Sequence, residues 1–282
     1  MTVSEKAYAK INLYLDVTAR REDGFHDIES LMHSVDLCDI VIISSSESER
    51  TEISITTNDP ELPTDSGNIV YRAITNYLSF FDRTARVEVN IEKKIPVGAG
   101  LGGGSSDAAA ALRAMNRIYG LASRDQLYEI ASGLGSDVPF CLRGGICLCH
   151  GRGEQITSVS SSECMTFVIA IGERRVSTPK AYAALDEKYS FFKEKKEIIS
   201  STDIADFPRF NIFEQVIDFD EIDKIKENMI KNGAEYTLMS GSGPSVFGEF
   251  KKQAHAEEAC DLLLKSGFSA FVCHSVYPEV NI

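Results

Sequence analysis

The chain has 282 residues, which gives room for one large domain or two modest ones. Hydrophobic residues make up 43% and charged residues 25%, as is ordinary for a globular protein, and no apolar run approaches the roughly 18 residues of a membrane span. A net charge of −13 argues against nucleic acid as a partner, because binding it needs a basic face. The N-terminus has neither a signal-peptide core nor a transit pattern, so we expect a cytoplasmic protein without membrane contact.

The first predicted element is a strand over residues 7–17, where apolar and polar side chains alternate strictly. This pattern directs Lys10 and Asn12 to the same face, about 7 Å apart. A solvated strand face would explain the same polar positions. An Asp-Gly turn then precedes Phe25 and His26, an aromatic ring and an imidazole that could stack on and hydrogen-bond a planar ligand. A loop whose Phe packs against the core is the alternative.

Strand-like segments at 28–35 and 40–43 precede a polar connection at 44–50. A helix is predicted over 69–81, and Asn68 before it is a good N-cap. Capping explains Asn68 without any ligand.

The most informative segment is a loop with five glycines within seven residues, at 98, 100, 102, 103 and 104. A predicted strand over 86–92 leads into it, and an Ala-rich helix over 108–119 follows. Glycines let a ligand approach the backbone closely, and a helix start presents unpaired N–H groups with a partial positive charge. The loop therefore predicts a phosphate site. In so acidic a protein, such a site must be locally basic or assisted by a metal ion.

Two other phosphate loops fit this segment poorly. Gly98, Gly100 and Gly103 satisfy the dinucleotide fingerprint, but its ribose-binding acid is expected about 20 residues on, and Asp125 there belongs to another helix. A Walker-type loop needs a Lys-Ser/Thr pair after its last glycine, where this chain has two serines. A glycine-rich turn that serves only close packing remains an alternative.

A helix over 124–134 leads to Asp137 in a glycine-flanked turn, where a turn-forming role and a functional role are both open. Cys147 and Cys149 precede a histidine, but Cys-x-Cys-His lacks the paired spacing of a zinc site. The apolar run around them favours buried free thiols.

The second half follows a polar linker at 157–163, the best candidate for a domain boundary. Ser177, Thr178 and Pro179 are typical of a helix start, and that helix carries Tyr182. The remaining predicted elements are a strand over 166–171, helices over 220–232 and 253–265, a second glycine loop at 239–245 and a strand over 270–276. Helices and strands alternate irregularly in both halves, which predicts an α+β or mixed α/β fold.

The Lys10 strand and the two glycine loops resemble the three motifs of the GHMP kinase superfamily, named for galactokinase, homoserine kinase, mevalonate kinase and phosphomevalonate kinase. More narrowly, five segments resemble the family of 4-diphosphocytidyl-2-C-methyl-D-erythritol kinases in order along nearly the whole chain: 9–13, 21–26, 96–106, 135–139 and 239–243. The resemblance implies a two-domain α+β fold with the active site in the cleft between the domains. Residues 1–160 would form a domain like domain 2 of ribosomal protein S5, and 161–282 a ferredoxin-like α/β sandwich.

The implied activity is phosphorylation of the 2-hydroxyl of a cytidyl diphosphate polyol by ATP, with Mg²⁺, in the non-mevalonate isoprenoid pathway. The substrate is the only implied partner of a monomer or weak homodimer, and no side chain is assigned as a metal ligand. Lys10 and Asp137 match the catalytic pair of the family. Asp137 would position the substrate hydroxyl rather than act as a strong base, because a nearby ammonium lowers a carboxyl pKa. Lys10 would stabilise the developing alkoxide.

By the same resemblance, Asn12 and His26 contact the cytidine half of the substrate, and Tyr182 stacks on its cytosine. Phe25 stands where the family often has Tyr. Asn68 and Lys93 match contacts to the nucleotide base, and the glycine loop contributes an ATP-binding set: Pro96, Gly98, Gly100, Leu101, Gly102, Gly103, Gly104, Ser105 and Ser106. The second glycine loop matches at Ser240, Gly241, Ser242 and Gly243.

Asp107 stands where some relatives have a neutral Asn. We expect it in the first helical turn, where an acid suits the helix dipole. Its closeness to the incoming phosphate argues against a direct metal role.

Three rival functions remain. A sister kinase for homoserine or mevalonate shares the glycine loop but does not need residues 23–26, which form the cytidine signature. A catalytically silent ligand-binding relative would not need both Lys10 and Asp137. The hypothesis of a dinucleotide-dependent dehydrogenase is weakened because the ribose-binding acid is not found at the expected position.

Overall fold

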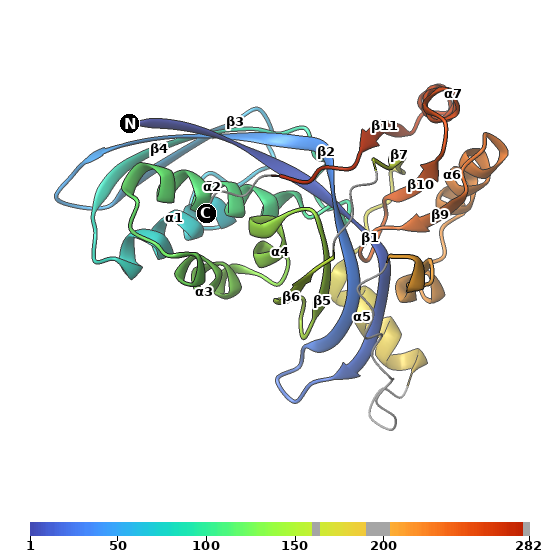
Figure 1. Ribbon diagram of the computed structural model, residues 1–282, viewed down its shortest axis with the longest axis horizontal. Helices are drawn as coiled ribbons and strands as arrows, with labels where there is room; N and C mark the ends of the chain where they lie inside the picture. Colours follow the sequence, from blue (N-terminus) through green and yellow to red (C-terminus); the bar gives the residue numbers. More distant parts are fainter. Residues whose placement is uncertain (160–163, 190–203, 279–282) are drawn as a thin grey trace.

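Two β-sheets organise the chain, one in each half, and helices pack on both (Figure 1). The structure is a computed structural model that describes residues 1–159, 164–189 and 204–278. The predicted α+β fold is confirmed. None of the helices in these ranges combines the length and the apolarity that crossing a bilayer requires.

The first sheet has seven strands, and two of them are unusually long. Strands β1 and β2 form an antiparallel hairpin whose register runs from Thr2 opposite Ser44 to Arg20 opposite His26. The strand path is β3-β4-β2-β1-β8, with β5 joined to β2 and to β6. The strands are β1 (Thr2–Arg20), β2 (His26–Glu47), β3 (Glu52–Thr57), β4 (Ala85–Glu92), β5 (Ile146–His150), β6 (Gln155–Ser158) and β8 (Phe210–Asn211).

Both long strands exceed their predicted lengths. The polar face of β1 is not solvated, since Lys10 and Asn12 are only 4% and 1% exposed, so that alternative is wrong. Strand β2 continues through the expected connection at 44–50 as far as Glu47. It does so because β4 supplies backbone partners there, which polar composition alone does not indicate.

Four helices cover one face of the first sheet (Figure 1). Asn68 caps the first of them as predicted, because its Oδ1 accepts from the backbone N–H of Val70 at 2.8 Å. In α2 the alanines at 108–111 are fully buried, and their small side chains let this helix pack closely between the sheet and its neighbours. The helices are α1 (Ile69–Phe80), α2 (Gly103–Tyr119), α3 (Arg124–Leu134) and α4 (Val138–Arg143).

The second half is built on a four-stranded antiparallel sheet with the order β11-β7-β10-β9. With helices α6 and α7, it has the strand order of a ferredoxin-like sandwich, as predicted. Its strands are β7 (Thr166–Ile171), β9 (Tyr236–Met239), β10 (Val246–Phe250) and β11 (Ser269–His274). Its helical segments are α5 (Thr178–Lys188), η1 (Ile204–Asp206), η2 (Ile212–Gln215), α6 (Asp220–Lys231) and α7 (Gln253–Lys265).

The two halves are interlocked rather than merely adjacent. Strand β8, from the second half of the sequence, pairs in parallel with β1 at Tyr14 and Leu15. Helix α5 lies beside the far end of the β1–β2 hairpin (Figure 1). Strand β6 extends into the predicted linker, and 160–163 lie outside the described residues, so the boundary at 160 stays a prediction.

Candidate active site

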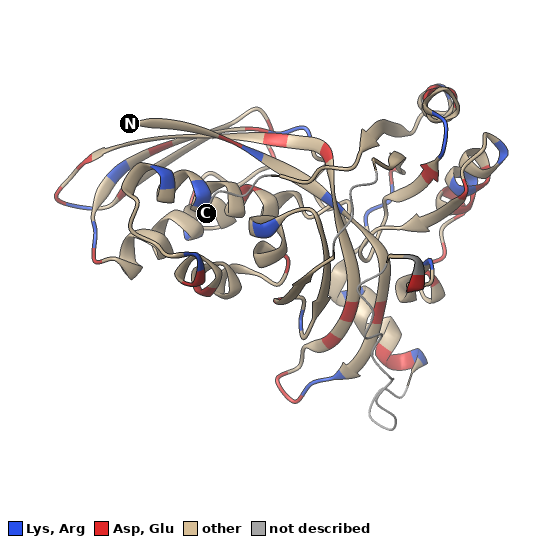
Figure 2. Ribbon diagram, in the orientation of Figure 1, with Lys and Arg blue, Asp and Glu red and all other residues tan. Residues whose placement is uncertain are grey.

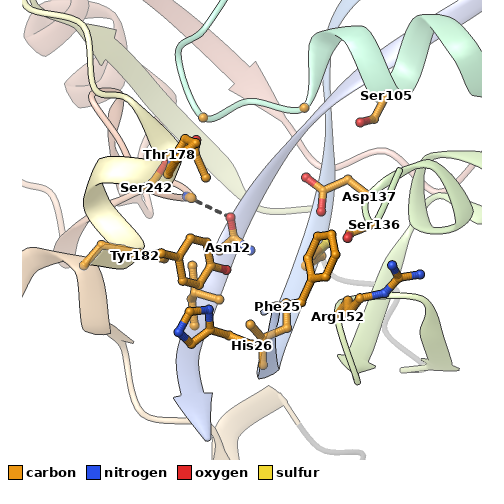
Figure 3. Close-up of a pocket in the computed structure, with 18 of the residues that line it drawn as sticks. Asn12, Phe25, His26, Ser105, Ser136, Asp137, Arg152, Thr178, Tyr182 and Ser242 are labelled. Carbon is orange, nitrogen blue, oxygen red and sulfur yellow. Dashed lines mark hydrogen bonds between the residues drawn. The ribbon is translucent and has the colours of Figure 1, made fainter. Parts of the chain in front are cut away.

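A cavity of about 620 Å³ opens where the two halves meet, and segments from both line it (Figure 3). Strand β1, the glycine loop and the start of α4 contribute from the first half, and α5 and the second glycine loop from the second. The predicted residues that it brings together are Lys10, Asn12, Phe25, His26, Gly100, Gly102, Ser105, Asp137, Tyr182, Gly241 and Ser242.

Lys10 is held in the cavity wall by its backbone and by its amine. Its backbone N–H donates to the carbonyl of Leu101 at 2.9 Å, so the glycine loop pairs with the open edge of β1. Its Nζ donates to Asn12 Oδ1 at 2.8 Å and lies 3.5 Å from Asp137 Oδ2. With a side chain only 5% exposed, this ammonium needs such partners, because an unpaired buried charge is costly.

Asp137 enters the cavity from the residue that precedes helix α4. It occupies the N-cap position, yet its side chain makes no capping hydrogen bond. Its carboxylate is 29% exposed and faces both Lys10 and the open cavity. The predicted turn position is therefore confirmed, and the carboxylate is placed to meet a ligand rather than to close the turn.

The glycine loop bends back on itself through three residues with positive φ, Gly98, Gly100 and Gly102. A Cβ on Gly102 would lie 2.9 Å from Lys10 Cγ, so this glycine is what lets the lysine pass. Helix α2 begins at Gly103, not at 108 as predicted. Its first N–H groups consequently lie beside the cavity, which Ser105 lines.

The second glycine loop packs directly on the first. The hydroxyl of Ser240 donates to the carbonyl of Gly100 at 3.0 Å, and the hydroxyl of Ser245 donates to the carbonyl of Ala99 at 2.6 Å. The backbone N–H of Gly241 donates to Asn12 Oδ1 at 2.9 Å, so one amide oxygen accepts from both Lys10 and this loop. Asn12 thereby couples the second half to the lysine.

Aromatic residues line the end of the cavity away from the loops. His26 stacks on Tyr182 with ring centroids 4.7 Å apart, and its Nε2 lies 2.7 Å from Asp186 Oδ1. Since a carboxylate only accepts, Nε2 carries the proton. Phe25 is 53% exposed, and the guanidinium of Arg152 lies 5.2 Å from its ring centroid.

Sequence reasoning missed Asp186 and Arg152, which also line the cavity. Asp186 is four residues after Tyr182 on one helix, so the two share a face, and this spacing was a usable signal. Arg152 stands between two glycines after β5, a basic residue in a turn that an anion could approach. Its nearness to Phe25 depends on tertiary structure.

Several predicted nucleotide contacts lie outside the cavity lining. Asn68 uses its side chain to cap α1 and to donate to the carbonyl of Pro63 at 2.7 Å. The other nucleotide contacts outside the lining are Lys93, Pro96, Gly98, Leu101, Gly103, Gly104 and Ser106, and Ser240 and Gly243 of the second glycine loop lie outside it as well. Their roles toward a nucleotide stay predictions.

Lys93 forms a buried ion triad with two carboxylates. Its Nζ bonds to Asp39 and, at 2.7 Å, to Asp107 Oδ2. The placement of Asp107 in the first helical turn is wrong: α2 begins early enough to put it in the second turn, and the first turn has no acid. Burial raises the pKa of Asp107 to about 7, against the attraction of Lys93.

The predicted buried thiols are confirmed, because Cys147 and Cys149 are free and buried in β5. Within the described residues, no three His, Cys, Asp or Glu side chains are grouped to hold a metal ion.

Two sequence models match the chain, the GHMP kinases N terminal domain at residues 68–145 and the GHMP kinases C terminal domain at 210–270. A protein of Caldicellulosiruptor saccharolyticus named 4-diphosphocytidyl-2-C-methyl-D-erythritol kinase is 41% identical over 271 residues, covering 92% of this chain and 91% of that protein. A crystal structure of 4-(cytidine 5'-diphospho)-2C-methyl-D-erythritol kinase matches with a TM-score of 0.81 and 30% identity, covering 97% of this chain and 99% of that one. A mevalonate kinase structure, with a TM-score of 0.73 and 15% identity over 99% of this chain and 100% of that one, shares the fold.

Proposed function

Because the chain belongs to the 4-diphosphocytidyl-2-C-methyl-D-erythritol kinase family of the GHMP kinases, we propose that it transfers the γ-phosphoryl group of ATP to the 2-hydroxyl of that compound. The observation that carries this proposal is one cavity in which a glycine loop, the Lys10–Asp137 pair and a ring-stacking site converge. This is the combination that a nucleotide, a reacting hydroxyl and a cytosine require.

ATP would place its phosphates against the glycine loop and the first turn of α2. The N–H groups there have no partners within the helix, and the partial positive charge of the helix start favours anions. Gly100, Gly102 and Ser105 line the cavity at this point. A phosphate can approach the backbone closely at Gly100 and Gly102 because glycine has no side chain.

Mg²⁺ would accompany the nucleotide and neutralise charge on its β- and γ-phosphates. Mg²⁺ prefers oxygen ligands and is commonly held by substrate phosphates with one or two carboxylates. Ser105 Oγ and the carboxylate of Asp137 are oxygen donors in the cavity and fit this requirement. Asp107 is less suited, since its carboxylate is buried and bonded to Lys93.

Lys10 and Asp137 would act on the hydroxyl that receives the phosphoryl group. Phosphoryl transfer asks the protein mainly for positioning and charge stabilisation. Asp137 accepts a hydrogen bond from the substrate hydroxyl, which orients the hydroxyl oxygen toward the γ-phosphorus of ATP. The ammonium of Lys10, 3.5 Å from that carboxylate, stabilises the charge that develops on the attacking oxygen.

The cytidine half would occupy the aromatic end. Phe25 offers an exposed ring face, and the His26–Tyr182 pair offers a polar edge beside a stacking surface. Arg152 supplies a cation for the diphosphate that joins the two halves of the substrate. The cytoplasmic location and the monomeric or weakly dimeric state stay predictions.

A phosphorylation assay with three acceptors tests the function. The purified protein is given ATP and Mg²⁺ with the cytidyl diphosphate alcohol, homoserine or mevalonate. We expect turnover of the cytidyl compound alone. Comparable or greater kcat/KM with homoserine or mevalonate would favour a sister kinase, and no turnover of any acceptor would favour a silent relative.

A further inference from the structure

A second, smaller cavity of about 270 Å³ lies between the first part of β1 and helices α2 and α4. It shares no lining residue with the candidate active site. Among the described residues, its lining includes four cationic side chains, Lys6, Arg113, Arg117 and Arg143, and a single acidic one, Glu5. We call it the basic cavity. In Figure 2 the Lys and Arg positions of α2 and α4 are drawn as blue bands on neighbouring helices.

Glu5 fixes two of the four cations in place. Its carboxylate is within ion-pair distance of Arg113 Nε at 3.1 Å and of Arg117 Nε at 3.0 Å. Arg113 also donates to the carbonyls of Cys141 and Lys6, at 3.0 and 2.8 Å. Arg113 thus links β1, α2 and α4 at the wall of the cavity.

The other two cations have no such partner. Neither Lys6 nor Arg143 forms an ion pair within 1–159, 164–189 and 204–278. Lys6 is exposed and Arg143 is half-buried, so a ligand could reach both side chains from solvent. With four cations and one carboxylate, the described lining of the cavity has an excess of positive charge.

We propose that the basic cavity binds a small polyanion of the phosphate or diphosphate class. Its volume is below the roughly 300–1,000 Å³ of sites for drug-sized ligands, which favours a compact anion. Lysine and arginine are the usual partners of phosphate oxygens. Arg117 and Arg143 lie in the last turns of α2 and α4, where a cation is favoured by the negative end of the helix dipole. That effect does not explain the presence of Lys6, which lies on a strand.

A bound anion would contact the elements that carry the candidate catalytic groups. Strand β1 also carries Lys10, helix α2 begins at the glycine loop, and α4 begins directly after Asp137. The site is independent of the proposed function, since none of its lining residues belongs to the reaction.

Calorimetric titration of inorganic diphosphate tests the proposal. The protein is first saturated with a non-hydrolysable ATP analogue, so that the glycine loop is occupied. We expect one further site, whose dissociation constant rises about tenfold in Arg143→Ala and in Lys6→Ala through loss of one charged contact. Lys231→Ala, which removes an exposed cation on α6, should leave the binding unchanged.

Added salt should weaken the same binding, because it screens the attraction between charges. Circular dichroism and kcat with the cytidyl substrate confirm that each variant is folded. The proposal is overturned if the saturated wild-type protein binds no diphosphate, or if Arg143→Ala and Lys6→Ala bind it as tightly as Lys231→Ala does.

Discussion

Lys10 shows what a single residue needs in order to be reactive and buried at once. Its amine is bonded to Asn12 and close to Asp137, so its charge is compensated while it lines the cavity. The alternation of β1 correctly placed Lys10 and Asn12 on one side of the strand. No local sequence pattern predicted that Asp137 lies close to Lys10, because Asp137 precedes a helix that is far from Lys10 in the sequence. The pairing of Lys10 with Asp137 was predicted from the resemblance to a kinase family and not from the local sequence pattern.

Asp107 is the residue whose environment the sequence predicted least well. Two carboxylates and one ammonium form the triad, so one negative charge is in excess in a buried place. Within the part of the chain that the structure describes, Asp107 Oδ1 is also buried without a hydrogen-bond partner. Burial, reinforced by the negative charge of Asp39, therefore favours the neutral form of this carboxyl and raises its pKa to about 7 from an ordinary value of 3.8.

We predict that Asp107→Asn stabilises the protein more at pH 8 than at pH 5. The folded protein holds a proton on Asp107 that the unfolded chain releases near pH 4. The contribution of this group to stability is therefore lost as pH rises through the folded pKa of about 7. Asn keeps the shape of the side chain and removes its charge. Between pH 5 and pH 8, the free energy of unfolding of the variant should therefore rise by on the order of 1–3 kcal/mol relative to that of wild type.

Thermal unfolding of both proteins at pH 5 and pH 8 measures this difference. Asp125→Asn, an exposed acid on α3, is the control and should show no such trend. A stability difference between Asp107→Asn and wild type that is the same at both pH values would contradict the proposed cause.

At the scale of elements, the two glycine loops form one unit. Helix α2 starts within a run of glycines, which helix propensity disfavours, and so the predicted start was five residues late. Packing explains the difference. A Cβ on Gly103 would lie 3.0 Å from Ile95 Cγ2 and 3.3 Å from Lys93 Nζ, so close tertiary contact selects glycine in this first turn.

We predict that Gly100→Ala separates the two loops, whereas Gly98→Ala does not. Both glycines have positive φ, 78° and 72°, so each substitution carries a similar backbone penalty of about 1 kcal/mol. A Cβ on Gly100 would overlap the carbonyl oxygen of Ser240 and lie 3.0 Å from that of Gly243, whereas a Cβ on Gly98 would have no atom of the described residues within 4 Å. The additional destabilisation expected for Gly100→Ala therefore comes only from disrupting the contact between the two loops.

The expected result is a lower melting temperature and at least a tenfold lower kcat/KM for Gly100→Ala than for Gly98→Ala. Equal losses in the two variants would mean that the contact between the loops contributes nothing to the site.

At the scale of the whole molecule, the site exists only because the halves interlock. The β1–β2 hairpin belongs to the first sheet, but its far end meets α5 of the second half, where Asp186 bonds to His26 and lies 3.3 Å from Arg20. Periodicity and capping predicted most helices and strands. They could not predict this docking, because it joins segments that are distant in sequence and carry no local signal.

We predict that Asp186→Asn raises KM for the cytidyl substrate roughly tenfold and leaves KM for ATP unchanged. The variant loses a charge-assisted hydrogen bond that holds His26 against Tyr182, typically 1.5–3 kcal/mol. His26→Ala should show the same selectivity for the cytidyl substrate. Glu187→Gln, the exposed neighbour on α5, is the matched control. An equal rise in both KM values would assign Asp186 to general support of the fold.

The kcat of Asp137→Asn with the cytidyl substrate and ATP tests most directly whether this cavity performs the transfer. We predict a kcat lower by roughly 10²–10⁴-fold, the range for a lost acid–base or positioning group, with the dissociation constant for ATP close to that of wild type. Asp261→Asn, an exposed acid on α7, should keep the full kcat. A kcat for Asp137→Asn near that of wild type would contradict the account.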